Sequence, residues 1–128
     1  MRKLMLVVSL AVVLVPLVAA AALAQQGKVI QCHKVPCYGS KGDDKIFERV
    51  GDGKKDVIVA KGGDDLVLAN KYTDDRDVVR GGRGRDKINV ADGDKRDLAN
   101  GGPGRDLCIV DAKKEAGTSC ASVRVRRP

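Results

Sequence analysis

Hydrophobic positions recur at regular intervals between Gly39 and Ile109, in short segments that polar or glycine-rich loops separate. An aspartate precedes each hydrophobic position by two residues, which divides this stretch into seven similar units. The aspartates are Asp44, Asp56, Asp65, Asp77, Asp86, Asp97 and Asp106, and the hydrophobic positions are Ile46, Ile58, Val67, Val79, Ile88, Ala99 and Cys108. One inward apolar side chain in each short segment predicts a short strand that contributes to a thin apolar interior.

The spacing of the aspartates alternates between long and short steps, so that every second unit is related by a nearly constant offset along the chain. A period of roughly 21 residues with two strands and two loops predicts an all-β fold, a parallel β-roll or β-solenoid of about 3.5 turns. Such turns must stack, because none buries its apolar face alone. We expect the extra residues 48–50, 69–71 and 90–91 to lengthen one strand or to form a bulge. A glycine-rich disordered segment, the alternative, would not keep the aspartates and aliphatic residues in phase.

The loops fall into two sets. The first-side loops (39–44, 60–65, 81–86 and 101–106) have glycine at their fourth position, whereas the second-side loops (51–56, 72–77 and 92–97) have Lys54, Asp75 and Lys95 there. Glycine lets a loop turn its carbonyl oxygens toward one point, and aspartate adds a carboxylate. Stacked loops of this kind predict an all-oxygen site, which suits Ca²⁺ better than Mg²⁺ or zinc.

The unit G-G-x-G-x-D-x-U-x, in which U is a large aliphatic residue, occurs at 81–89 and is closely repeated at 101–109. With its partners it resembles the hemolysin-type (RTX) calcium-binding repeats over residues 39–109. The resemblance implies a parallel β-roll that binds Ca²⁺ between successive loops on the same side. The first-side residues that it implicates are Gly42, Asp44, Gly63, Asp65, Gly81, Gly82, Gly84, Asp86, Gly101, Gly104 and Asp106.

The second-side loops match this pattern less fully, with Asp56, Asp77 and Asp97 as their implied ligands. Lys55, Arg76 or Arg96 stands directly before each aspartate, so pairing of these bases with the aspartates in place of a metal is an alternative. On this basis we expect Asp65→Ala to weaken calcium binding more than Asp77→Ala.

Both ends of the chain carry further signals. Residues 1–24 form a predicted signal peptide: a basic start, an apolar run over residues 4–17 and an A-x-A-like site at 22–24. A retained membrane helix is the alternative. The mature chain would then be residues 25–128, divided into an N-terminal cap segment (25–38), the roll (39–109), and a C-terminal cap with a basic, solvated tail (110–128). An anionic surface is the alternative partner of this tail.

Four cysteines in an exported chain predict disulfides, for which three connectivities are open. Proximity along the chain favours Cys32–Cys37 and Cys108–Cys120, one at each end of the roll. Zinc binding is the competing interpretation, but the spacing and the compartment argue against it.

Candidate chemistry narrows the function. His33 is the single histidine, and the sequence shows no nucleophile–histidine–acid set. It shows no phosphate-binding loop either. We therefore expect a secreted, extracellular calcium-binding β-roll without catalytic activity.

Without Arg2 and Lys3 the mature chain has 22 basic and 17 acidic residues, a net charge of +5. The alternative function is therefore binding of anionic cell-envelope polymers through Lys41, Lys45, Arg83, Lys87, Arg85 and Arg105. Neither nucleic-acid binding nor stable membrane insertion after signal cleavage is expected.

Overall fold

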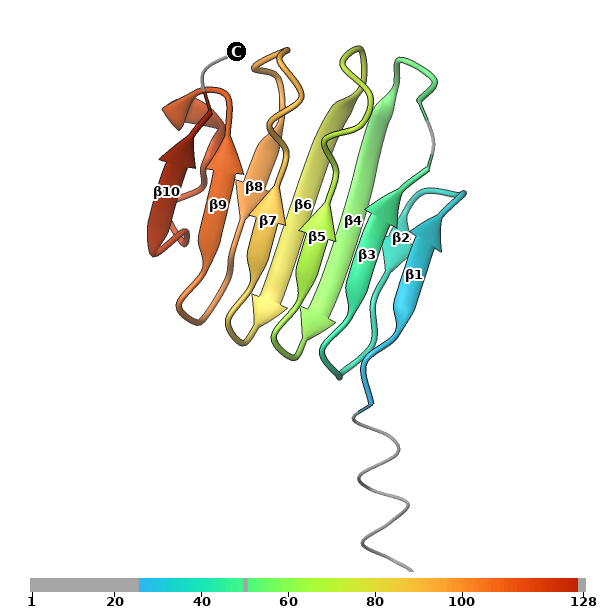
Figure 1. Ribbon diagram of the computed structural model, residues 1–128, viewed down its shortest axis with the longest axis vertical. Helices are drawn as coiled ribbons and strands as arrows, with labels where there is room; N and C mark the ends of the chain where they lie inside the picture. Colours follow the sequence, from blue (N-terminus) through green and yellow to red (C-terminus); the bar gives the residue numbers. More distant parts are fainter. Residues whose placement is uncertain (1–25, 50, 127–128) are drawn as a thin grey trace, which may run out of the picture.

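The computed structural model describes residues 26–49 and 51–126, so the predicted signal peptide lies outside the described residues. The chain forms two parallel sheets in a β-solenoid of about three turns (Figure 1). The six-stranded sheet has the order β1-β3-β5-β7-β9-β10 and the four-stranded sheet the order β2-β4-β6-β8. The strands are β1 (Val29–Cys32), β2 (Cys37–Tyr38), β3 (Lys45–Glu48), β4 (Lys55–Gly62), β5 (Leu66–Leu68), β6 (Arg76–Arg83), β7 (Lys87–Asn89), β8 (Leu98–Asn100), β9 (Leu107–Val110) and β10 (Ser122–Val125).

The register of the strands follows the sequence period. In the larger sheet Ile46 aligns with Val67, Val67 with Ile88, and Ile88 with Cys108, so equivalent positions of the repeat lie side by side. In the smaller sheet Asp56 aligns with Asp77 and Val79 with Ala99, which again pairs each unit with the second one after it. The predicted all-β class and parallel β-solenoid are therefore confirmed.

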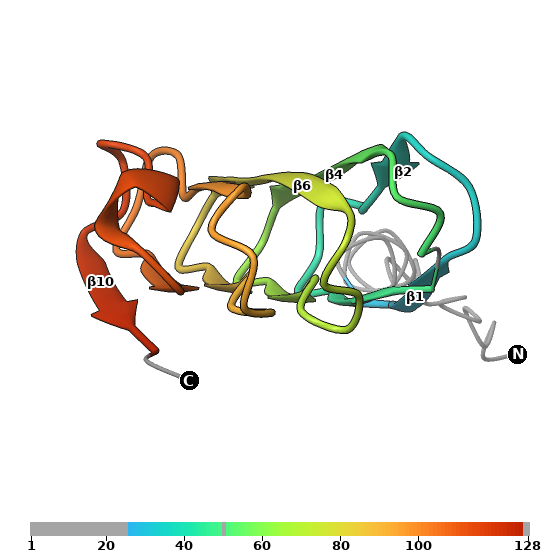
Figure 2. The same cartoon turned by 90° about the horizontal axis from the view of Figure 1, so that it is seen from above.

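The two sheets face each other (Figure 2). The core is a thin layer of side chains between them. All seven hydrophobic positions of the repeat point into it and are at most 1 % exposed. They are joined there by Ala60, Ala69, Val90 and Val110. Because a strand alternates its faces, the residue two before each hydrophobic position also points inward, and that residue is the aspartate. Burying the apolar row therefore also buries a row of carboxylates at each turn.

The two kinds of turn differ in length. The first-side connections β4–β5 and β6–β7 have three residues each, 63–65 and 84–86, whereas β2–β3 and β8–β9 have six. The second-side connections include the extra residues, and 69–75 separate β5 from β6. We expected these extra residues to lengthen a strand. Glu48 does so, because it is the last residue of β3, but β5 and β7 end before Ala69 and Val90. Ala69 and Val90 are fully buried and widen the second-side turns instead.

Both ends of the solenoid are covered by strands and disulfides. Strand β1 pairs with β3 in the N-terminal cap segment, and the predicted bridges Cys32–Cys37 and Cys108–Cys120 are both present, with Cα–Cα distances of 5.6 and 5.8 Å. The predicted basic tail, residues 123–128, is not a free segment at its start: β10 pairs with the open edge of β9, while the β10 side chains remain exposed as expected. An exposed strand edge offers unpaired backbone groups, and the tail satisfies them. A short 3₁₀ helix, η1 (Lys113–Glu115), precedes β10.

Candidate metal-binding turns

The aspartates of the first-side loops form a hydrogen-bonded ladder along the solenoid. In each step a carboxylate Oδ1 accepts the backbone N–H of the equivalent aspartate one turn earlier. The N···O distances are 2.7 Å from Asp44 to Asp65, 2.9 Å from Asp65 to Asp86, and 2.9 Å from Asp86 to Asp106. Asp44 in turn accepts the Lys28 N–H at 2.7 Å. The repeated aspartate therefore ties successive turns together through the backbone.

The second carboxylate oxygen of this ladder is buried against loop glycine. A Cβ at Gly81 would overlap Asp86 Oδ2, and one at Gly101 would overlap Asp106 Oδ2. Glycine is thus required for space at 81 and 101, whereas the equivalent position of the loop 60–65 accommodates Ala60. The Oδ2 atoms of Asp65, Asp86 and Asp106 have no hydrogen-bond partner among the described residues. Burial raises the pKa of Asp65 to about 7 and that of Asp86 to about 6, since the charged form loses its hydration.

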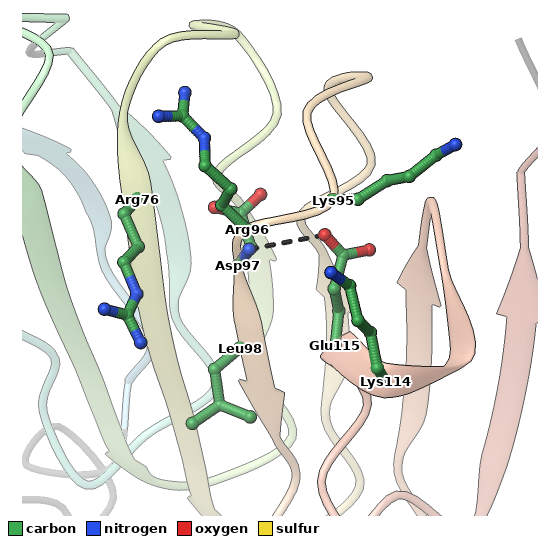
Figure 3. Close-up of a pocket in the computed structure, with 7 residues that line it drawn as sticks. All are labelled: Arg76, Lys95, Arg96, Asp97, Leu98, Lys114 and Glu115. Atoms are coloured by element: carbon green, nitrogen blue, oxygen red, sulfur yellow. Dashed lines mark hydrogen bonds between the residues drawn. The ribbon is translucent and has the colours of Figure 1, made fainter.

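On the second side the ladder is shorter and ends on a glutamate. Asp97 Oδ1 accepts the Asp77 N–H at 2.8 Å, and Glu115 Oε1 accepts the Asp97 N–H at 3.3 Å (Figure 3). Glu115 Oε2 also accepts the N–H groups of Asp111 and Ala112, at 2.9 and 2.8 Å. The side chain is 1 % exposed, so η1 places a buried acid where the next turn would have supplied an aspartate.

Asp77 donates its N–H to this ladder, but its carboxylate takes no part in it. The side chain is 0 % exposed, and neither Oδ1 nor Oδ2 has a hydrogen-bond partner among the described residues. Glu48 and Asp56 lie beside it, each offering one oxygen, and the three oxygens all lie within 4.8 Å of one another. Glu48 Oε1 and Asp56 Oδ1 are also buried without partners. We call Glu48, Asp56 and Asp77 the carboxylate cluster.

Three strands supply the carboxylate cluster. Glu48 ends β3 and points inward because it is two residues beyond the buried Ile46, while Asp56 and Asp77 face each other across the β4–β6 pairing. Their exposed fractions are 3, 1 and 0 %, respectively. The cluster therefore joins carboxylates that come from both sheets at one second-side turn.

The electrostatics of the carboxylate cluster oppose full ionisation. Burial, reinforced by the neighbouring acids, raises the pKa of Asp77 to about 9. Burial also raises the pKa of Glu48 to about 7, despite the hydrogen bond that Glu48 Oε2 accepts from Lys71 N–H, and raises the pKa of Asp56. Neighbouring buried carboxylates cannot all carry charge without a counterion. At neutral pH this cluster must hold protons or a cation.

Basic side chains do not supply that counterion. The ion pairs of the described residues are Lys54–Asp52 at 3.2 Å and Arg96–Asp94 at 2.7 Å, and neither involves the cluster. The bases directly before the second-side aspartates are exposed, and the alternative in which they pair with those aspartates finds no ion pair here. Asp75, fully buried nearby, uses Oδ1 to accept the Gly53 N–H and leaves Oδ2 without a partner.

A second group of acids lies in the last second-side loop, where oxygens of Asp92, Asp94 and Asp97 come within 4.8 Å of one another. Much of its capacity is already used. Asp94 binds the Arg96 side chain and its backbone N–H, Asp92 Oδ1 accepts the Asp94 N–H, and Asp97 is part of the ladder. This group is therefore less suited to a cation than the carboxylate cluster.

The structure thus places the predicted residues in two environments. The first-side aspartates are separated along a ladder, each bonded to the backbone of its neighbour. Two of the second-side aspartates, Asp56 and Asp77, meet in the carboxylate cluster, and Asp97 lies in the other acidic group. Sequence reasoning missed Glu48. Its signal was the two-residue spacing from Ile46, which places both side chains on the inward face of β3.

No protein-family model matches this chain, and neither the curated proteins nor the solved structures contain a match. The assignment of the fold and the interpretation of the acidic groups therefore depend on the sequence and the structure alone. Within residues 26–49 and 51–126, no helix has the length and the apolar character that a membrane crossing requires.

Proposed function

We propose that this chain is a secreted, non-catalytic calcium-binding β-solenoid and that the carboxylate cluster is its principal metal site. This proposal reverses the order of Asp65 and Asp77 that we expect from the sequence alone. One observation carries this proposal: three buried carboxylates from two sheets, with oxygens within 4.8 Å of one another and no basic partner among the described residues. Ca²⁺ binds six to eight oxygens at about 2.3–2.6 Å in loose geometry, which such a set can begin to satisfy. Mg²⁺ needs a tighter octahedron, and zinc prefers nitrogen or sulfur ligands.

The repeat pattern adds support for calcium as the metal, because hemolysin-type repeats bind it. It also keeps the first-side loops as predicted additional sites, where buried Oδ2 atoms of Asp65, Asp86 and Asp106 lack partners. Secretion is supported by the predicted signal peptide and by two disulfides, which persist in oxidising compartments. The absence of catalysis is inferred from the single histidine and the lack of a catalytic set in the sequence.

Isothermal titration of Ca²⁺ into the oxidised chain from residue 25 tests the proposal. We expect a Kd of about 0.1–1 mM, the range of extracellular calcium modules. Binding should release protons, since the pKa of Asp77 is raised to about 9 and that of Glu48 to about 7, and the observed heat should therefore vary with the ionisation enthalpy of the buffer.

Matched variants locate the site. Glu48→Gln should weaken binding at least about tenfold, because it removes one of three charges from the carboxylate cluster. Asp43→Asn removes an equal charge from an exposed position of a first-side loop and should change the Kd less than twofold. No calcium binding below about 10 mM would overturn the proposal, and tight binding lost only in Asp65→Asn would move the site to the first-side loops.

A further inference from the structure

Lys61 adopts a backbone conformation that its own repeat assigns to glycine. Its φ is +84°, in the left-handed region, and it aligns with Gly82 in the next turn, where φ is +111°. Gly102, one turn further, has φ +97°. A side chain in this region is strained, whereas glycine is not. Because glycine occupies this position in two later turns, the fold does not require a lysine side chain here.

Lys61 lines a surface cavity of about 510 Å³ together with Lys41, Arg83 and the backbone of Gly62 and Gly63. The cavity has a simple origin in the repeat. Positions 41, 62 and 83 are equivalent in three successive turns, and the middle one is a glycine. Lys41 and Arg83 are therefore two strand spacings apart, about 10 Å, with an empty position between them.

Three positive charges meet at this cavity without neutralisation by its lining, which contains no carboxylate among the described residues. All three side chains are exposed, and the ion pairs within the described part of the chain do not include them. The Lys61 Nζ lies 5.4 Å from the centre of the Tyr38 ring, a contact that positions the ammonium and leaves its charge intact. We call Lys41, Lys61 and Arg83 the basic cavity.

Two exposed acids of the first-side loops form no ion pair with these bases within the described residues. Asp43 and Asp64 are exposed, and each uses Oδ1 to accept a backbone N–H one turn further on, from Asp64 and Arg85, at 2.8 Å. Their positions are taken in the next two turns by Arg85 and Arg105. Positive charge therefore continues from the basic cavity along the solenoid axis.

We propose that the basic cavity binds a phosphate or sulfate ester of an extended anionic polymer. Such an ester has three free oxygens, and three cations from three successive turns can each bind one of them. The cavity volume also leaves room for the sugar or polyol that carries the ester. Of the six basic residues that the sequence suggested for polymer binding, Lys41 and Arg83 belong to this site, while Lys45 and Lys87 lie on β3 and β7 of the other sheet.

Three dextrans that differ in their anionic group test the proposal: dextran sulfate, phosphorylated dextran and carboxymethyl dextran. Binding to the oxidised chain is measured by titration calorimetry in about 1 mM Ca²⁺, at low and at high NaCl concentration, roughly 50 and 300 mM. Sulfated and phosphorylated dextran should bind at least threefold more tightly than carboxymethyl dextran, and all three should weaken at the higher salt concentration.

Lys61→Gly is the decisive variant, because glycine already stands at this position in the following turns. It should weaken binding of sulfated and phosphorylated dextran at least fivefold while the melting temperature stays equal or rises. Lys45→Ala, which removes a charge from an exposed position outside the basic cavity, should change binding less than twofold.

Two results would overturn the assignment: unchanged binding in Lys61→Gly, or an equal loss in Lys45→Ala. The first would show that Lys61 does not contact the polymer, and the second that only overall charge matters. Duplex DNA that binds as tightly as the dextrans would likewise show unspecific polyanion binding. The carboxylate cluster contains none of these basic residues, so Asp77→Asn should leave dextran binding unchanged, and the two proposals can fail separately.

Discussion

Replacing Asp77 with asparagine should remove most of the stabilisation that calcium gives this protein. Asparagine has nearly the same shape but lacks the charge, and Asp77 is the member of the carboxylate cluster with both oxygens unpartnered among the described residues. A cation bound to the folded state alone stabilises it by RT ln(1 + [L]/Kd). For a Kd of about 0.1 mM and about 1 mM Ca²⁺ this is about 1.4 kcal/mol, whereas a tenfold weaker site yields about 0.4 kcal/mol.

These energies correspond to measurable shifts of the melting temperature. For a chain of about this size about 1 kcal/mol shifts Tm by roughly 4–8 °C, so calcium should raise the Tm of the wild type by about 6–11 °C and that of Asp77→Asn by no more than about 3 °C. Without calcium, at slightly alkaline pH, Asp77→Asn should be at least as stable as the wild type. It removes an acid whose buried carboxylate has no partner, and whose pKa is raised to about 9.

Thermal unfolding followed by circular dichroism, in EDTA and in about 1 mM free Ca²⁺, measures both effects. Asp65→Asn is the matched control, since its side chain is buried in the first-side ladder and Oδ1 still accepts the Asp44 N–H after substitution. Its calcium shift should exceed that of Asp77→Asn, because this substitution leaves the carboxylate cluster intact. If Asp77→Asn keeps the full shift and Asp65→Asn loses it, the metal binds in the first-side loops and our argument from the carboxylate cluster is refuted.

Stability without calcium should fall as pH rises from about 5 to 8. Acids whose folded pKa lies above the unfolded value, such as Glu48 and Asp65 at about 7 and Asp77 at about 9, bind more protons in the folded state, and this advantage is lost as pH passes those values. Melting in EDTA across this range checks the sign, and a Tm that rises with pH would contradict it; calcium should flatten the slope. Glu115→Ala should lower the free energy of unfolding by about 2–4 kcal/mol, because three backbone N–H groups lose their acceptor, whereas the exposed neighbour Lys114→Ala should change it by less than about 0.5 kcal/mol in urea titrations. Ile88→Ala should cost about 2–5 kcal/mol in the same assay because Ile88 is fully buried in a thin core, and the partly exposed Leu98→Ala should cost far less.

The two kinds of turn divide the chemistry of this protein between opposite edges of the sheets. At the second-side turns the extra residues bring Glu48 to Asp56 and Asp77, and the resulting charge is negative and buried. At the first-side turns the aspartates are engaged by backbone N–H groups, while Lys41, Lys61 and Arg83 create an exposed positive cavity. A divalent cation and a polyanion would therefore bind at separate edges of one solenoid.

The sequence by itself determined the architecture. A hydrophobic residue at a fixed place in each unit and a nearly constant period of two units allow one parallel register, and the observed pairings follow it. It also favoured the two disulfides that form, because short spacing brings each pair together at one end of the roll. These features depend on neighbours along the chain or on strict repetition, which a linear pattern records.

Only the tertiary structure decided where the acids meet. Asp56 and Asp77 differ from Asp65 and Asp86 by little in sequence, yet the wider second-side turn moves Glu48 beside them and leaves the Asp77 carboxylate outside the backbone ladder. The same holds for β10, since a basic segment that looks solvated in the sequence pairs with the free edge of β9. Distances between side chains from different turns depend on the path that each loop takes and on how the sheets stack, and a repeat pattern contains neither.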